Sequence, residues 1–172
     1  MQAEAKQMSI ADPILMEIDQ EAATTRRILE RVPEDKLTWK PHPKSMSLGQ
    51  LALHIAMTQG AVAEMTLADS VEPPAFEQPE AKSRAEILEA FEASTLKAKE
   101  VLGGTDNERA MATWSMLKDG KPLMEIPRVG VWRAILLNHL YHHRGQLSVY
   151  LRELDVPVPS IYGPSADENP FG

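Results

Sequence analysis

The chain contains no cysteine, and this absence removes several kinds of chemistry at once. A protein without thiols forms no disulfide, offers no thiolate to a metal ion and has no cysteine nucleophile. The chain also has no run of 18 apolar residues, so no transmembrane helix is expected. Its N-terminal segment lacks the apolar core of a signal peptide. We therefore expect a cytoplasmic protein with no membrane partner.

Positive charge is the second scarcity. The 18 lysines and arginines are outnumbered by 25 aspartates and glutamates, which gives a net charge of −7. Nucleic-acid binding depends on clustered lysine and arginine, and no basic run is found, so we expect no nucleic-acid partner. The remaining composition, 43% hydrophobic and 25% charged over 172 residues, predicts one globular domain spanning residues 1–172.

Helix signals divide the first part of the chain into two long segments. Asp12-Pro13 is typical of a helix start, with the aspartate as N-cap and proline at the first helical position. Apolar residues then recur at helical spacing until Pro33 ends the segment. A proline-rich loop follows. A second helix is predicted to begin at Ser45 or Ser47 and to run to about residue 68.

Two further helices are predicted in the second half. Ser83 caps one of them, and Gly103-Gly104 ends it. The last helix starts between Val129 and Val131 and continues to about Leu154. Before it, Asp119-Gly120 between two partly apolar arms predicts a short β-hairpin. The tail from about residue 155 is rich in proline and is expected to be irregular. The fold class is thus all-α, a four-helix bundle with a hairpin excursion before the last helix.

Histidines on the inner faces of these helices are the main functional signal. On a helical wheel, His143 lies about 40° from His139, in the middle of the apolar stripe, whereas His142 lies at its edge, about 60° to the other side. In the second predicted helix His54 also lies on the apolar face. The fifth histidine, His42, lies in the proline-rich loop.

Two interpretations of the inward histidines compete. One buried histidine is more often a hydrogen-bonded core residue than a ligand. Three of them in one bundle interior leave many ring nitrogens to be paired, which an apolar core cannot do. A divalent metal ion resolves this, because neutral imidazoles are good ligands and histidines at i and i+4 can hold one ion. We therefore predict metal binding by His54, His139 and His143.

Other residues of the last helix have less specific expectations. Gln146 and Tyr150 share the inward face and could contact a ligand or hydrogen-bond in the core, while Arg144 projects elsewhere and is expected in an ion pair or interface. No general base can be named. A pocket could involve further aromatic residues, although packing is the commoner role: Trp114, Trp132, Tyr162. A second apolar strip on this helix predicts a homodimer, and its members are Leu137, Leu140, Tyr141 and Leu151.

The stretch "HLYHHRGQL" resembles the DinB-like (DNA-damage-inducible) family of four-helix-bundle metalloproteins. The family pattern is one histidine in the second helix and His-x-x-x-His in the fourth, often followed by Arg-Gly-Gln. His54, His139 and His143 match it, and "SMSLGQLALHI", "WKPHPKS" and "VPSIYGPSAD" are also similar. The resemblance covers essentially the whole chain. It implies that these three histidines bind a divalent transition metal, with water in the open positions.

Some members of this family are thiol-dependent enzymes, and many have no assigned activity. The resemblance therefore implies a metal-dependent thiol S-transferase acting on a small molecule, with a low-molecular-weight thiol as cosubstrate. Zinc or nickel is the expected metal, with iron or manganese as alternatives. Because HExxH is missing, a metalloprotease arrangement is not expected. A metal-dependent hydrolase and a non-catalytic metal-binding stress or interaction protein remain the alternatives.

Overall fold

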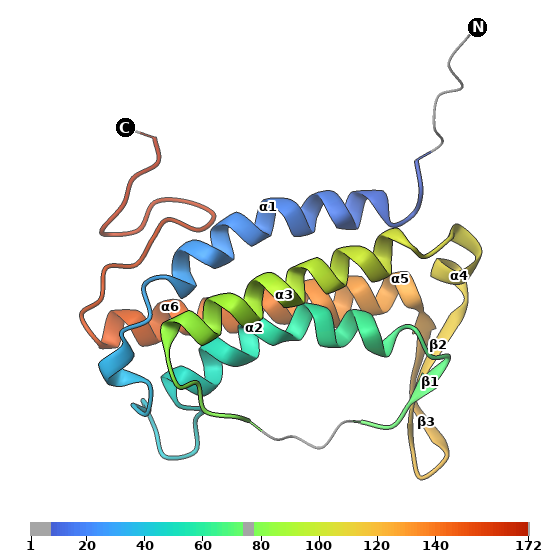
Figure 1. Ribbon diagram of the computed structural model, residues 1–172, viewed down its shortest axis with the longest axis horizontal. Helices are drawn as coiled ribbons and strands as arrows, with labels where there is room; N and C mark the ends of the chain where they lie inside the picture. The colour runs from blue at the N-terminus through green and yellow to red at the C-terminus, as the bar shows by residue number, and fades with distance from the viewer. Residues whose placement is uncertain (1–7, 74–77, 172) are drawn as a thin grey trace, which may run out of the picture.

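The structure is a computed structural model that describes residues 8–73 and 78–171. It is mostly helical, with a small sheet at one end (Figure 1). The elements in chain order are α1 (Asp12–Leu29), η1 (Glu34–Lys36), α2 (Leu48–Met65), β1 (Ser70–Val71), α3 (Arg84–Gly103), α4 (Asn107–Met111), β2 (Thr113–Lys118), β3 (Lys121–Pro127), α5 (Arg128–Val131), η2 (Trp132–Leu137) and α6 (Asn138–Glu153).

Side-chain caps fix where the central helices begin. Ser47 forms a capping box with Gln50 at the start of α2: its hydroxyl accepts from the Gln50 amide, and the Gln50 side chain accepts from the Ser47 amide. Ser83 caps α3 in the predicted way, by accepting a hydrogen bond from the Glu86 amide. Of the two serines predicted for α2, the structure therefore selects Ser47.

The predicted cap of the first helix is wrong by one residue. Ala11 occupies the N-cap position, and Asp12 is the first helical residue. The Asp12 carboxylate accepts a hydrogen bond from the Ser9 amide at 2.7 Å, so it stabilises the preceding turn. Its negative charge still lies in the first turn, where it interacts favourably with the positive end of the helix dipole.

The predicted hairpin is present but belongs to a larger sheet. Strands β2 and β3 are antiparallel and are joined by Asp119 and Gly120, whose φ angles of 52° and 73° define the left-handed conformation that a two-residue turn needs. The short strand β1 pairs with β2 in parallel, with Ser70 opposite Ser115. The all-α prediction therefore needs correction, since a three-stranded sheet in the order β1-β2-β3 adds to the helical core. Helix α4, capped by Asp106, was not predicted either.

The last predicted helix is continuous but not uniform. It begins as α5, widens into the π-helical segment η2 and continues as α6. A π-helix bonds residue i to i+5, so each residue advances the helix by less than 100°. A wheel with uniform steps therefore describes α6, which carries His139 and His143, better than the residues before it. Trp132 and Leu136 in η2 are nevertheless fully buried.

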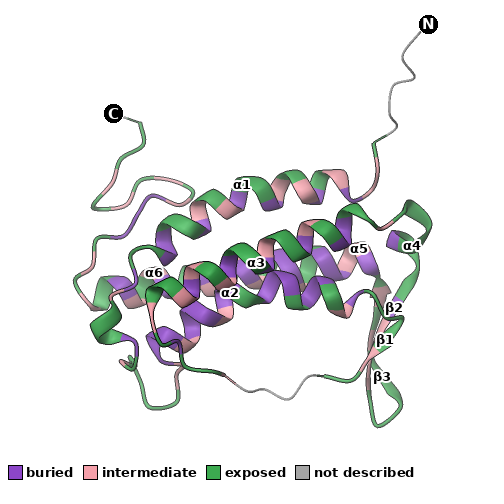
Figure 2. Cartoon of the chain, viewed as in Figure 1, coloured by how far each residue is buried: buried purple, intermediate pink, exposed green. Residues whose placement is uncertain are grey.

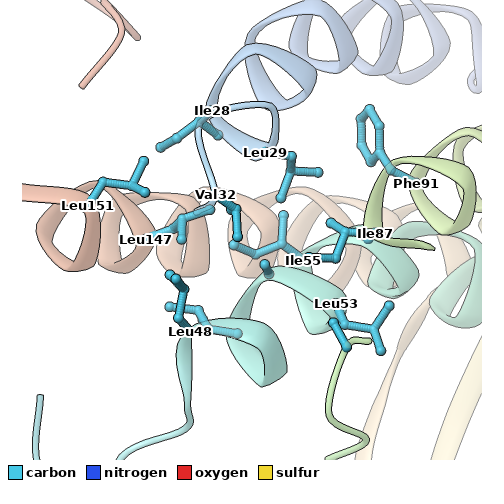
Figure 3. Close-up of a cluster of buried hydrophobic side chains, with 14 of the residues drawn as sticks. Ile28, Leu29, Val32, Leu48, Leu53, Ile55, Ile87, Phe91, Leu147 and Leu151 are labelled. Carbon is cyan, nitrogen blue, oxygen red and sulfur yellow. The ribbon is translucent and has the colours of Figure 1, made fainter. Parts of the chain in front are cut away.

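Apolar side chains fill the space between the long helices. Buried residues lie on the inner faces of α1, α2, α3 and α6, and exposed residues lie on the outer faces (Figure 2). The cluster in Figure 3 joins the end of α1, the beginnings of α2 and α3 and the second half of α6; its labelled members are Ile28, Leu29, Val32, Leu48, Leu53, Ile55, Ile87, Phe91, Leu147 and Leu151. A second cluster surrounds the fully buried Trp114 and Trp132 at the end near the sheet. Both tryptophans therefore pack in the core.

The apolar strip that predicted a homodimer is covered within the chain. Leu137, Leu140 and Leu151 are at most 1% exposed, and the Tyr141 hydroxyl donates a hydrogen bond to Glu17 of α1 at 2.5 Å. This strip therefore offers no surface to a second copy. The homodimer remains a prediction, but this strip no longer supports it.

The tail is irregular, as predicted, but it is held against the helices. Its residues 155–171 form neither helix nor strand. Asp167 pairs with Arg152 of α6, and Glu168 pairs with Arg27 of α1. Tyr162 lines a shallow pocket between the tail and Ser148 of α6. Among the described residues, no helix combines the length and apolar character needed to cross a bilayer.

Candidate metal centre

Three histidines from two helices meet at one point. His54 comes from the second turn of α2, and His139 and His143 come from successive turns of α6. The Nε2 atoms of His54 and His139 are 3.2 Å apart, and those of His139 and His143 are 2.5 Å apart. One ring nitrogen from each residue lies within 4.8 Å of the others. Helical periodicity predicted these three residues on the apolar faces of their helices, and in the structure their side chains meet.

The tautomer of His143 follows from its neighbour on the same helix. Its Nδ1 lies 2.7 Å from Oε1 of Gln146, an amide oxygen that can only accept, so Nδ1 carries the proton. The lone pair of His143 is then on Nε2, and it faces the other two histidines. Gln146 lies on the predicted inward face of the helix, and a hydrogen bond of this kind to a histidine ring orients a metal ligand.

Burial keeps the three imidazoles neutral. Loss of solvation lowers the pKa of His54 and of His139, and nearby histidines lower both further. The same loss of solvation lowers the pKa of His143 to about 4, although the hydrogen bond to Gln146 acts in the opposite direction. Neutral imidazoles are the form that binds a metal ion. At neutral pH the centre therefore presents ligands and no competing protons.

The spacing of these nitrogens fits a single tetrahedral ion. Zinc–nitrogen bonds of about 2.0–2.1 Å place two nitrogens of one ion about 3.3 Å apart. The separation of 3.2 Å between His54 and His139 matches this, and the 2.5 Å between His139 and His143 requires a shift of less than about 1 Å. Without an ion, Nε2 of His139 would lie close to two other ring nitrogens, and each of these two contacts would need a proton to join it. The donor set is thus suited to a divalent transition metal.

The centre is built from histidine alone in the part of the chain that the structure describes. The metal-type cluster found there contains no carboxylate. Three neutral ligands leave the full charge of a divalent ion uncompensated and leave coordination positions open, as catalytic sites do. The other two histidines lie outside it: His142 is exposed, and His42 accepts a hydrogen bond from the Lys44 amide in the loop before α2.

Tyr150 lies two helical turns beyond His143 and does not reach the histidines. Its hydroxyl donates to the carbonyl of Met46 at 3.3 Å, and its ring meets that of Trp39 edge-on, with 5.5 Å between centroids. The inward position on the wheel is therefore correct. Of the two roles considered for it, the structure gives hydrogen bonding within the fold.

Arg144, next to His143, is one half of a buried ion pair. Its guanidinium lies 2.6 Å from the Glu21 carboxylate of α1, and the two side chains are 1% and 7% exposed. Nη1 also donates to Thr25 at 3.0 Å, Nη2 donates to the Tyr162 hydroxyl, and that hydroxyl donates to Glu21 at 3.0 Å. The rings of Tyr141 and Tyr162 both flank the guanidinium. An ion pair or an interface was the predicted role of Arg144, but nothing in the sequence points to Glu21 as its partner.

Comparisons with known proteins agree with this architecture. A mostly helical protein with three histidines gathered between two helices matches the family model "DinB family" over residues 1–169. The chain belongs to the DinB family, and the resemblance stated from the sequence is confirmed.

Individual relatives are more distant. The chain is 25% identical over 162 residues to the uncharacterized protein YrdA of Bacillus subtilis (strain 168), an alignment that covers 91% of this chain and 90% of YrdA. A crystal structure of a DinB-like protein from Bacillus cereus ATCC 10987 has a TM-score of 0.73 at 20% identity and covers 90% of this chain and 98% of its own. A second DinB-like structure, YjoA of Bacillus subtilis, has a TM-score of 0.63 at 19% identity, covering 83% and 92% respectively. These structures support the fold alone.

Proposed function

We propose that the protein is a metal-dependent thiol transferase in which His54, His139 and His143 bind one divalent transition metal. The observation that carries this proposal is the convergence of three neutral imidazoles on one point, without a carboxylate among them. Zinc or nickel suits this donor set best, and iron or manganese is the alternative. In this proposal the four long helical segments form a four-helix bundle. The protein acts in the cytoplasm and is a homodimer.

The chain's own residues have defined tasks in this proposal. His54 and the α6 histidines hold the ion from two helices, and Gln146 fixes the ring of His143 so that Nε2 faces the ion. When bound, the ion supplies a Lewis acid that lowers the pKa of a coordinated thiol or water. Because the chain has no cysteine, the thiol must be an external cosubstrate. A free thiol has a pKa of about 8.5, so lowering that pKa makes thiolate available at neutral pH.

The experiment combines metal analysis with a conjugation assay. The wild-type protein should contain one divalent ion per chain and should conjugate a small electrophile with bacillithiol, mycothiol or glutathione. His143→Ala should lose both the ion and the activity. His142→Ala is the matched control, since His142 is the exposed neighbour on the same helix, and it should keep both.

Three results would count against the proposal. A stoichiometric ion in the His54, His139 and His143 triple-alanine variant would reject the ligand set. Equal conjugation rates in the wild type and His143→Ala would reject thiol transfer. Metal-dependent hydrolysis of an ester or amide, without any thiol-dependent turnover, would replace it with the hydrolase alternative, and no turnover at all would favour a non-catalytic metal-binding protein.

A further inference from the structure

The loop before α2 is basic in an otherwise acidic protein. Residues 38–46, "TWKPHPKSM", contain Lys40, His42 and Lys44 and no acidic residue, whereas the whole chain carries a net charge of −7. All three side chains are exposed. Within residues 8–73 and 78–171, neither lysine forms an ion pair. The loop therefore offers positive charge that no described carboxylate neutralises.

Backbone hydrogen bonds hold this loop in place. The carbonyls of Leu37 and Trp39 accept from the first two amides of α2, at 2.8 and 2.9 Å, and the Ser45 amide donates to the carbonyl of His42 at 2.9 Å. Pro41 and Pro43 restrict the backbone further. The lysines consequently extend from a fixed support, which reduces the entropy lost when they bind a ligand.

The loop lies along the same two helices as the histidines. His54 lies seven positions after Ser47, the N-cap of α2, and Tyr150 lies seven positions after His143 on α6. Seven positions are two helical turns, or about 10 Å, on the same face of each helix. The hydrogen bond from Tyr150 to Met46 ties α6 to the loop at that distance. Figure 1 shows the loop at the beginning of α2, beside the second half of α6.

Partly exposed polar and aromatic side chains cover the distance between the two positions. Gln50 lies one turn before His54, and Gln146 lies one turn after His143. Trp39 of the loop and Tyr150 of α6 then form an edge-on aromatic pair. At the start of α2, the Ser47 hydroxyl lies within hydrogen-bond distance of both carboxylate oxygens of Glu80, at 2.6 and 2.8 Å.

We infer that Lys40 and Lys44 bind the carboxylate of an elongated thiol cosubstrate whose sulfur lies at the three histidines. This inference rests on the proposed function and adds the chemical class of the cosubstrate. The histidines lie about 10 Å along their helices from Ser47 and Tyr150, which adjoin the loop, and we infer a separation of about that length between sulfur and carboxylate. The aromatic pair and the exposed Gln146 would contact the part of the molecule between them. A thiol of the same length without the carboxylate lacks the charge that the lysines recognise.

The test uses two matched series of probes on the cobalt-loaded protein. One series consists of ω-mercaptocarboxylic acids of increasing chain length, and the other of ω-mercaptoalcohols of the same lengths. Thiol binding is followed by the change in the visible absorption of the cobalt ion. We expect acids to bind more tightly than alcohols by about three- to tenfold, the contribution of two partly exposed ion pairs. The preference should be largest at an extended length of about 10 Å.

Two double variants of equal charge complete the design. Lys40→Gln/Lys44→Gln should abolish the preference for acids and leave the binding of alcohols unchanged. Lys118→Gln/Lys121→Gln removes the same charge from the exposed ends of β2 and β3 and should keep the preference. Equal affinities for acids and alcohols in the wild type, or an undiminished preference in Lys40→Gln/Lys44→Gln, would overturn the inference alone. Failure of every thiol to change the cobalt spectrum would overturn both the inference and the proposed thiol chemistry.

Discussion

Replacing Arg144 with methionine should destabilise the protein severely. The substitution keeps the unbranched stem of the side chain but removes the guanidinium, whose positive charge lies 2.6 Å from the Glu21 carboxylate. Both side chains are buried, so the remaining carboxylate would be left without its cation in a region that excludes water. Removing one partner of a buried ion pair costs about 3–5 kcal/mol of the free energy of unfolding. A domain of this size typically has only about 5–15 kcal/mol in total.

Two further variants separate the charge from the packing around it. Tyr162→Phe removes the hydroxyl that bonds both Arg144 and Glu21, yet it leaves the ion pair intact, so it should cost about 1 kcal/mol. In Arg144→Met/Glu21→Leu both charges are gone. This double variant should recover most of the loss, because replacing a buried pair by apolar residues is often close to neutral.

Urea unfolding followed by circular dichroism measures these differences, with the slope of the transition as a check that the denatured state is unchanged. The melting temperature of Arg144→Met should fall by about 6–20 °C. If Arg144→Met cost no more than Tyr162→Phe, the unpaired Glu21 carboxylate would not be the cause of instability. If the double variant were as unstable as Arg144→Met, the loss would come from packing of the guanidinium between Tyr141 and Tyr162.

Three other predictions follow from the centre and the hairpin. Gln146→Leu should lower metal affinity about 10- to 100-fold by leaving the His143 ring without its acceptor, whereas Gln146→Glu should not; competition with a chromophoric chelator distinguishes them. The metal-free protein should lose stability as the pH falls from 6.5 towards 4. The folded state holds the pKa of His143 at about 4, so the unfolded chain takes up the proton first. In unfolding titrations His143→Leu should lose less stability over this pH range. Gly120→Ala should cost about 1–2 kcal/mol, since its φ of 73° disfavours a side chain, and an unchanged melting temperature would contradict this.

Sequence patterns were most informative where a local rule determines structure. Serine caps, the paired glycines at the end of α3 and the Asp119-Gly120 turn act through neighbouring residues, and the structure has each of them. The inward positions of the three histidines could be predicted in the same way. Their positions on α2 and α6 follow from helical periodicity, which also explains why His142 lies outside the cluster.

Features that depend on partners far apart in the sequence could not be predicted. Glu21 and Arg144 are more than a hundred residues apart; the sequence predicted an ion pair or interface for Arg144, but nothing near either residue identifies Glu21 as its partner. The pairing of β1 with β2 is similar, because a two-residue strand has no periodicity to recognise. The dimer strip failed for the same reason: the wheel showed an apolar face on the last helix, but only the fold shows that α1 covers it.

The π-helical segment η2 has a consequence for how the chain tolerates changes in its length. In a regular α-helix, inserting or deleting one residue rotates everything beyond it by about 100°. A π-helical turn accommodates one extra residue while keeping the flanking helix in register. Deleting the exposed Ala134 should therefore let η2 close into an α-helix without turning His139 and His143 away from His54. A one-residue deletion between His139 and His143 falls in the regular α-helix α6, which has no extra residue to lose, so it would turn the two rings apart. The segment between the sheet and the histidines can thus lose one residue, and the orientation of the histidines on α6 is kept.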